Sequence, residues 1–345
     1  MKQIRKILTA GLIFSMLLLV ACQGNGGKPG EKEVSSPKKE NDSITLRVAS
    51  VVSQSAKDAA EIFTKEVAEK TDGRIQVKFF HDNQLGDDKA VVESTQMGDI
   101  DMAISPITPL ASFFDDFFLF DAPFIFSDYQ EVYDVLDGEV GQGMMRDLEQ
   151  FKLKVLGFGE NGFRYLTNNK LPVKSPDDLK GLKIRVMENE IQLKTWEALG
   201  ANPTPMSFNE LYTALQQNTV DGEENSLGII DSSQFMTVQK YLTLDKHTYV
   251  PFVFCMNLDK FNELSKEDQA VLLEAGKTWV KNQREFSQKY DHSILEKYQK
   301  DDQLEVIDIS SDEQAVWKKK IEDAGIYKLI REKLSHPEYL DTILK

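Results

Sequence analysis

The sequence contains few of the residues that build metal sites and redox centres. Of its 345 residues, two are cysteine and four are histidine. The histidines do not show the spacing of metal ligands: they are His81, His247, His292 and His336. The motifs H-E-x-x-H, C-x-x-C and G-x-S-x-G and the Walker-type phosphate loop are also missing. The sequence therefore predicts a protein that is not an enzyme and needs neither a metal nor a cofactor.

Long hydrophobic runs are equally scarce, and the clearest one lies at the N-terminus. Residues 8–20 are apolar apart from small residues and Ser15, and they follow a basic start. This pattern predicts a secretory signal peptide over residues 1–21, too short for a membrane span. The run ends in Leu-Val-Ala before Cys22, which resembles the bacterial lipobox, where the cysteine is acylated and becomes the new N-terminus. The alternative is an ordinary signal peptide followed by an unrelated cysteine.

Positive charge is in deficit along the whole chain. There are 41 Lys and Arg residues against 56 Asp and Glu, a net charge of −15. Removing residues 1–21 takes away three positive charges and leaves −18. Such a balance argues against binding to nucleic acid or electrostatic adhesion to anionic lipid. We expect a monomer.

Residues 23–42 have almost no large apolar side chain. They are rich in glycine, lysine, serine and proline, which predicts a flexible tether over residues 22–42 between the anchor and the folded body. Once Cys22 is lipidated, Cys255 has no partner for an intramolecular disulfide. It lies in the apolar run FVFCM, so we expect a small buried hydrophobic residue there.

The body begins at Ser43 and alternates between two periodicities. Residues 44–48 and 75–79 alternate as strands, and residues 56–70 and 87–97 have helical spacing. A third strand follows at residues 101–105. Strand, helix, strand, helix, strand is typical of a parallel sheet covered by helices, so the sequence predicts an α/β fold.

The second half continues in the same style. A helix is expected to start at residues 175–178 and to stop at Gly181, before a strand at 182–186. Residues 207–210 match a capping box. A helical stripe of apolar residues follows, formed by Phe208, Leu211, Tyr212 and Leu215. Residues 265–300 contain no proline and one glycine, which predicts one unusually long helix. A strand at 304–309 and a C-terminal helical region complete the chain.

The segment GFGENG at residues 157–162 has the G-x-G-x-x-G spacing of a dinucleotide-binding loop. Such a loop must end a strand and open a helix, whose N-terminus faces the phosphates. Here the following residues, 163–167, are β-prone, and residues 168–172 read as a turn. Asp177 is better suited to capping a helix than to binding a ribose. We therefore interpret the glycines as a sharp bend between two strands.

Two arginines lie within expected strands. Arg185 is out of phase with the apolar residues of its strand and lies near the strand's carboxyl end, where open α/β sheets bind ligands. Arg164 likewise opposes its apolar neighbours. A guanidinium removed from solvent needs an anion, and its planar fork suits a carboxylate. The alternative for each arginine is an ordinary salt bridge within the protein or a solvated strand face.

Four segments occur in order within the middle of the chain, and a fifth lies in its first half. The segments are GFR (162–164), LKGLKIRV (179–186), ALGANPTPMSF (198–208), DGEEN (221–225) and QLGDD (84–88). Together they resemble the solute-binding proteins of tripartite ATP-independent periplasmic (TRAP) transporters, the DctP family, and the likeness covers the chain from about Ser43 onward.

The resemblance implies a two-lobed periplasmic-binding-protein-like fold, with a ligand cleft between the lobes and a long helix spanning both. It implies capture of a small organic acid and delivery to a small and a large integral-membrane subunit. By the same resemblance, Arg185 grips the ligand carboxylate, Arg164 is the second cleft arginine, and Asn225 orients the ligand. Phe208 matches a cleft aromatic residue, and Glu188 is a weaker candidate for a polar contact.

Several departures from the family pattern narrow the expected ligand. Sialic-acid binders have a glutamate after the third strand, where this chain has Ser105 and Pro106. Met187 replaces a proline, and DGEEN replaces DGQEN. These changes argue against sialic acid and favour a C4-dicarboxylate or a sugar acid such as a uronate. Two other functions stay open, a ligand sensor for a membrane kinase and a secreted enzyme acting on acidic sugars.

The resemblance also suggests how the chain divides. We expect lobe 1 to comprise residues 43–163 and 251–290, and lobe 2 to comprise residues 164–250 and 291–345. The mature protein would stay outside the cytoplasm, attached by its lipid to the outer face of the cytoplasmic membrane.

Overall fold

A nine-stranded mixed sheet forms the centre of the structure, a computed structural model that describes residues 43–344. Eight strands follow the order β2-β1-β3-β8-β4-β7-β5-β6, and β9 pairs with β8. Signal peptide, Cys22 and tether lie outside the described residues. The strands are β1 (Ile44–Ala49), β2 (Ile75–Phe80), β3 (Met102–Pro106), β4 (Leu153–Asn168), β5 (Lys183–Val186), β6 (Asn202–Pro205), β7 (Gly222–Asn225), β8 (Tyr241–Asn257) and β9 (Glu305–Asp308).

The predicted α/β character is confirmed at both ends of the sheet. At one end β1 pairs in parallel with β2 and β3, and at the other β5 pairs in parallel with β6 and β7. Each end belongs to one lobe of a two-lobed fold. Helices connect the parallel strands, as this connection requires: α1 (Gln54–Lys70), α2 (Asp88–Met97), α5 (Glu190–Leu199) and α6 (Phe208–Gln216).

Two long antiparallel strands, β4 and β8, join the two lobes. They pair with each other along nearly their whole length. The C-terminal half of β8 also pairs with β3, whereas the C-terminal end of β4 pairs with β7. The expected lobe boundaries at 163/164, 250/251 and 290/291 fall inside β4, β8 and the long helix α9, and they stay a prediction.

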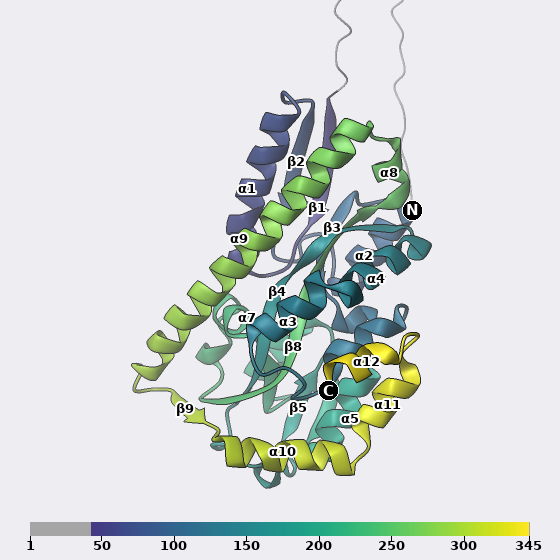
Figure 1. Cartoon of the computed structure of the whole chain (residues 1–345). Helices are drawn as coiled ribbons and strands as arrows, with labels where there is room; N and C mark the ends of the chain where they lie inside the picture. The colour runs from purple at the N-terminus through teal and green to yellow at the C-terminus, as the bar shows by residue number, and fades with distance from the viewer. Residues whose placement is uncertain (1–42, 345) are drawn as a thin grey trace, which may run out of the picture. The chain divides into compact units, whose positions relative to one another are not determined.

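The long helix is confirmed as α9 (Lys266–Gln299), with Ser265 as its N-cap. It runs obliquely past α1 and β4 towards α7 (Leu227–Ser232) and β9 (Figure 1). One large hydrophobic cluster joins α1, α6, α7 and α9 to one face of the sheet. A second joins α2, α5 and the C-terminal helices to the other face. Because each cluster contains residues from elements of both lobes, the core follows the faces of the sheet.

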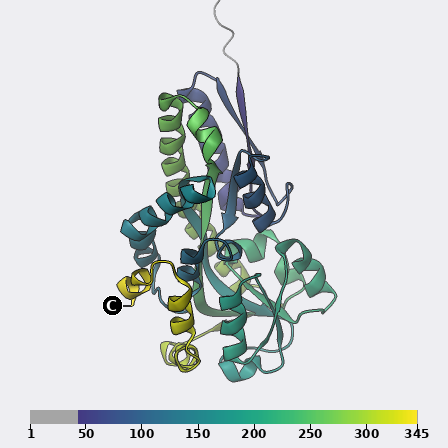
Figure 2. The same cartoon turned by 90° about the vertical axis from the view of Figure 1, so that its right-hand side faces the viewer.

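The remaining helices complete these two layers. In Figure 2 the C-terminal helices lie beside the lobe that contains α5 and α6. None of the helices in residues 43–344 is both long and apolar enough to cross a membrane. The helices not yet given are α3 (Tyr129–Asp137), α4 (Glu139–Asp147), α8 (Leu258–Glu263), α10 (Ser311–Asp323), α11 (Ile326–Lys333) and α12 (Glu338–Ile343). There are also 3₁₀ turns at Thr108–Leu110, Asp115–Asp121, Leu148–Phe151, Pro176–Leu179 and Phe235–Thr237.

Two local predictions are wrong at the start of α6. Ser207 is the N-cap, but its side chain makes no capping hydrogen bond, so the capping box does not form. Tyr212 is 36% exposed and therefore lies outside the buried stripe, whereas Leu211 and Leu215 are buried. Residues 175–178 do form a capping box, although a 3₁₀ turn rather than an α-helix follows.

The GFGENG segment is not a bend between two strands, which corrects the prediction. It lies inside the single strand β4, whose pairing with β8 shifts register between Val155 and Gly157 and again between Glu160 and Gly162. Gly162 has a φ of 117° and takes up the second irregularity. Gly157 and Gly159 serve a different purpose, because α9 packs directly on the backbone there. The glycines let the long helix approach the long strand.

We expect Gly159→Ala to destabilise the protein by about 1–3 kcal/mol, because the new methyl group overpacks a buried contact. Its carbon would lie 2.7 Å from the Trp279 ring and 2.8 Å from the Gln283 side-chain oxygen. Urea denaturation would measure the loss as a lower midpoint at an unchanged slope.

Gly228→Ala is the matched control. Gly228 is in a helix, and a methyl group there would meet only Asp291 at 3.6 Å. Its midpoint should stay at or slightly above that of the wild type. Equal midpoints for the wild type and Gly159→Ala would show that α9 does not need the glycine.

Two buried carboxyl groups lie where β4, α3 and α9 meet. Glu160 accepts a hydrogen bond from Tyr133, and Asp291 accepts one from the Gly228 amide at 3.1 Å. Both side chains border Gly162, since Glu160 Cγ and Asp291 Oδ2 lie within 4 Å of the point where a Gly162 Cβ would be. Burial raises the pKa of Glu160 to about 7 and that of Asp291 to about 8.

These raised pKa values make the folded state bind protons that the unfolded chain releases above about pH 4. The stability they contribute is complete below that pH and is lost as the pH rises through 7 and 8. We therefore expect the free energy of unfolding to fall between pH 5 and pH 9, and to fall less steeply in Asp291→Asn. Denaturation midpoints across this range measure both slopes.

Asp178→Asn serves as the control for this pH dependence. Partial burial raises the pKa of Asp178, but hydrogen bonds from the amides of Ser175 and Lys174 outweigh it and lower the pKa. The group is then ionised in both states above pH 5, so its removal should leave the slope unchanged. An Asp291→Asn slope as steep as that of the wild type would contradict the assignment.

Candidate ligand-binding site

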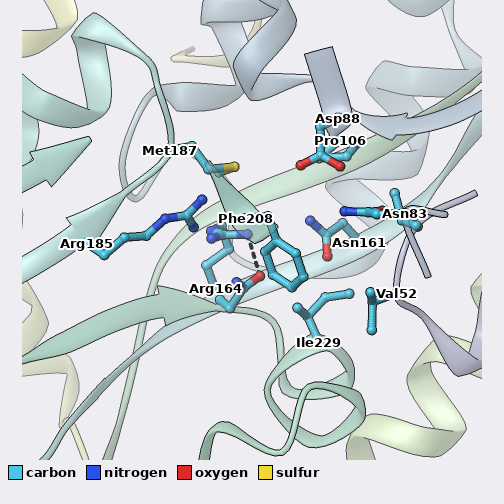
Figure 3. A pocket seen from close by; sticks show the side chains of 12 residues that line it. Val52, Asn83, Asp88, Pro106, Asn161, Arg164, Arg185, Met187, Phe208 and Ile229 are labelled. Atoms are coloured by element: carbon cyan, nitrogen blue, oxygen red, sulfur yellow. Dashed lines mark hydrogen bonds between the residues drawn. The ribbon is translucent and has the colours of Figure 1, made fainter. Parts of the chain in front are cut away.

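A hollow between the two lobes contains most of the residues that the sequence singled out. It has about 330 Å³ of space not filled by protein atoms, part of it open to solvent. Figure 3 shows the side chains around it. One lobe contributes Val51, Val52, Asn83, Asp88 and Pro106, β4 contributes Asn161 and Arg164, and the other lobe contributes Arg185, Met187, Phe208, Asn225 and Ile229.

The sheet topology places the hollow at the carboxyl ends of parallel strands. Val51 and Pro106 follow or end β1 and β3 in one lobe. Arg185 and Asn225 are at the ends of β5 and β7 in the other. The hollow therefore lies beyond these strand ends, where open α/β sheets bind ligands, and the ligand site itself stays a prediction.

Arg185 is a buried cation without an acidic partner in residues 43–344. Its side chain is 2% exposed, and its Nε and Nη2 atoms both donate to the carbonyl oxygen of Met206, at 3.0 and 2.7 Å. Nη1 is buried and has no hydrogen-bond partner among the described residues. Burial lowers the pKa of Arg185, although Glu224 and other carboxylates at longer range oppose this effect. Its guanidinium points into the hollow (Figure 3).

Arg164 is also buried, but it is already paired. It forms a two-pronged ion pair with Glu224, through Nε to Oε2 and through Nη2 to Oε1 at 2.9 Å. Its Nη1 donates to the Asn225 side-chain oxygen at 2.9 Å. The salt-bridge alternative therefore holds for Arg164, even though the same side chain lines the hollow.

A histidine supports this pair from behind. His247 contacts Glu224 Oε2 through Nε2 at 3.1 Å and Asp245 Oδ2 through Nδ1 at 2.8 Å. Burial opposes the charged forms, but Asp245 and Glu224 raise the pKa of His247 to about 9. Burial would also raise the pKa of Glu224, yet Arg164 and His247 lower it to about 2. The group is therefore a fixed network of opposite charges.

Counting donors separates the roles of the two arginines. A guanidinium has five N–H groups. Arg164 uses one on Nη1, both on Nη2 and the one on Nε, which leaves one. Arg185 uses two and keeps three, including both on Nη1. Only Arg185 can therefore offer two parallel hydrogen bonds to a carboxylate.

Three asparagines provide neutral polar groups around the arginines. Asn225 donates to Glu223 at 3.2 Å and accepts from Arg164, so one of its amide hydrogens is left. Asn161 accepts from Ser226 at 2.9 Å, and no protein acceptor for its amide hydrogens is found in residues 43–344. Asn83 donates to Asn209 at 3.2 Å. These amides can donate to or accept from ligand hydroxyl groups.

Phe208 and Glu188, also singled out from the sequence, are placed differently. The half-buried Phe208 ring lines the hollow and packs 5.9 Å from Phe235, between ring centres. Glu188 is exposed and lines a smaller neighbouring hollow instead. The structure thus brings Arg185, Arg164, Asn225 and Phe208 together but leaves Glu188 at the rim.

Sequence reasoning gave no role to Asp88, although it lines both hollows. It is the first residue of α2, directly after the helix cap Asp87. Burial raises its pKa to about 6, against the opposing effect of Arg185. An acidic residue that starts a helix after a parallel strand could have marked Asp88 as a candidate site residue. The direction of its side chain, however, depends on how α2 packs on the sheet.

The chain offers a possible metal cluster away from this hollow. Of the residues that the structure describes, Asp116, Asp147 and His336 bring three ligand atoms within 4.8 Å of one another. His336 contacts Asp116 at 2.7 Å, so an ion pair accounts for the arrangement. Cys255 is free and buried, and burial raises the pKa of its thiol to about 12. This agrees with the expected small buried hydrophobic residue.

These features define a two-lobed fold with a hollow between the lobes whose lining can accept a small anion. The sequence pattern of the family described as "Bacterial extracellular solute-binding protein, family 7" (DctP) matches residues 48–328. The chain belongs to this family, which includes the solute-binding proteins of TRAP transporters.

Three relatives show how close this likeness is. The 2,3-diketo-L-gulonate-binding periplasmic protein YiaO of Escherichia coli is 37% identical over 69% of this chain and 73% of its own. The C4-dicarboxylate-binding protein DctB of Bacillus subtilis is 30% identical over 81% of both chains. The sugar acid binding protein DctPAm of Advenella mimigardefordensis, solved with galactonate, has a TM-score of 0.84 and is 33% identical, covering 88% of this chain and 97% of its own.

Proposed function

We propose that this protein captures a small organic acid outside the cytoplasm by its carboxylate and delivers it to the membrane subunits of a TRAP transporter, without chemical change. The observation that carries the proposal is Arg185. It is 2% exposed, lines the hollow, and has no ion-pair partner in residues 43–344. A buried charge without a counter-ion is unfavourable by several kcal/mol, so the site lacks an anion that a ligand can supply.

The second arginine supports this assignment indirectly. Arg164 and Glu224 neutralise each other, and His247 is held between Glu224 and Asp245. A ligand carboxylate near them therefore meets one uncompensated positive charge, that of Arg185. Arg164 would add one further hydrogen bond. Affinity then comes from local groups, because the net charge of the whole chain is −15 and repels anions at long range.

The ligand class follows from the rest of the lining. Asn161, Asn225 and Phe208 surround the arginines with amide groups and one apolar face. Relatives are named for 2,3-diketo-L-gulonate and for C4-dicarboxylates, and one was solved with galactonate. We therefore propose a C4-dicarboxylate or a sugar acid such as a uronate as ligand, with Glu188 a peripheral contact.

The two lobes would close on the ligand. Closure excludes water and strengthens the ion pair with Arg185. The lobes would be residues 43–163 with 251–290 and residues 164–250 with 291–345. The protein would stay at the membrane through the acylated Cys22 and the tether at 22–42.

Replacing Arg185 by alanine should weaken binding of the acid ligand by about thirtyfold or more, because truncating a buried charge pair costs at least about 2 kcal/mol. A thermal-shift screen of the mature domain with organic acids would find the ligand, and calorimetry would measure affinity.

Arg74→Ala is the matched control. Arg74 forms a two-pronged pair with Asp268, at 2.8 and 3.0 Å, and is not part of the hollow. Its loss should leave ligand affinity unchanged. Wild-type affinity in Arg185→Ala, or shifts with neutral sugars alone, would refute the carboxylate-binding role.

We expect Cys22→Ala to move the protein from the membrane fraction to the soluble fraction, because a lipid chain is the proposed attachment. Fractionation of cells followed by immunoblotting measures this. Cys255→Ala is the control, since that thiol is buried and its loss should not change the fraction. Unchanged membrane association of Cys22→Ala would show that another feature holds the protein there.

A further inference from the structure

We infer that Asp88 makes the hollow selective for hydroxylated monocarboxylates and against acids that have a carboxylate at each end. This inference rests on the proposed function, because it assumes that Arg185 holds one ligand carboxylate. It narrows the ligand class from organic acids in general to sugar acids with a single carboxylate, such as aldonates and uronates.

The Asp88 carboxylate has no protein partner. In residues 43–344, no side chain or backbone amide donates a hydrogen bond to it, whereas its backbone oxygen accepts one from Ser105 Oγ at 3.1 Å. The neighbouring Asp87 side chain accepts from the Ala90 amide at 3.0 Å and fixes the first turn of α2. Asp88 is therefore held by its backbone while its carboxylate stays available.

Asp88 and Arg185 approach the hollow from opposite sides. In Figure 3 the Arg185 guanidinium enters from β5, and the Asp88 carboxylate points in from the far wall beside Pro106. They form neither a hydrogen bond nor a salt bridge with each other, although each influences the other's pKa at longer range. A ligand that reaches across the hollow has a cation at one end and an anion at the other.

The two ends select different chemical groups. An ionised aspartate only accepts hydrogen bonds, so it suits ligand hydroxyl groups and repels a second carboxylate. Asp88 also complements the positive end of the α2 dipole, but that role alone does not require a carboxylate that faces other polar groups. Asp88 lines a hollow with amide groups from Asn83, Asn161 and Asn225, which also fit hydroxyls.

The pH dependence gives a second test. Burial raises the pKa of Asp88 to about 6, whereas the Arg185 and Arg164 charges lower it and Asp87 raises it further. Across the neighbouring hollow it also faces Lys89 and Glu188. Once protonated, Asp88 can donate to a carboxylate, so dicarboxylate binding should strengthen as the pH falls below 6.

Two matched ligand pairs test the inference by calorimetry. Galactonate and galactarate share their carbon chain and inner hydroxyls and differ only in the terminal CH₂OH or carboxylate. Erythronate and meso-tartrate form the same comparison with four carbons. In the wild type we expect the monocarboxylate of at least one pair to bind about tenfold or more tightly than its partner at pH 8, because the second carboxylate meets an unpaired like charge.

Asp88→Asn should reduce this preference by about tenfold or more, because the amide keeps the shape, loses the charge and can donate to a carboxylate. It should also remove the gain in dicarboxylate binding between pH 8 and pH 5. Glu93→Gln is the matched control. It removes one charge from an exposed position on the same helix and should keep the wild-type preference and pH dependence.

The outcomes separate the inference from the function beneath it. Tighter binding of the dicarboxylates by the wild type, an unchanged preference in Asp88→Asn, or binding of none of the four acids would overturn the role of Asp88. The carboxylate-binding function would still stand if another acid bound and Arg185→Ala abolished that binding. Retained affinity in Arg185→Ala would instead remove the function itself.

Discussion

The arrangement of the site depends on one constraint, the burial of the Arg185 guanidinium without an internal anion. Among residues 43–344 its only acceptor is the Met206 carbonyl, which satisfies two of its five N–H groups and none of its charge. Burying such a group without a counter-ion is unfavourable by several kcal/mol, and an anion bound from outside would offset that cost. The neighbouring acidic residues do not supply the counter-ion. Glu224 is committed to Arg164 and His247, and Asp88 lies across the hollow without reaching Arg185.

The scaffold holds these charges where the two lobes meet. The strand ends of both lobes open into the same hollow because β4 and β8 lie between the two ends of the sheet and α9 packs along β4. Gly157 and Gly159 allow that packing, since any side chain there would collide with Val280 or Trp279. The acids Glu160 and Asp291 lie at the same crossing and make its stability depend on pH. Binding chemistry and the joint between the lobes thus share a few neighbouring residues of β4.

Local patterns predicted most elements but not their long-range relations. Helices α1 and α9 and strands β1, β2 and β9 were found within a few residues, because burial on one face imposes a clear period. The glycine segment was misread as a bend, since the helix that requires it is more than a hundred residues away in sequence. The capping box at Ser207 was also wrong, because a matching sequence pattern does not guarantee that the capping hydrogen bond forms. Asp88 was given no role because nothing local shows which way the first residue of a helix points.

By itself, the sequence determined the α/β class, the acidic charge balance, the family and the choice of Arg185 and Arg164 as site candidates. Each depends on residue types and on spacing along the chain. The tertiary structure decided which arginine is free: Glu224 lies 60 residues from Arg164 in the chain, yet it neutralises that arginine and leaves Arg185 unpaired. The structure also placed Asp88 opposite Arg185 and Glu188 outside the main hollow. Electrostatic pairing depends on distance in space, which only the folded sheet sets.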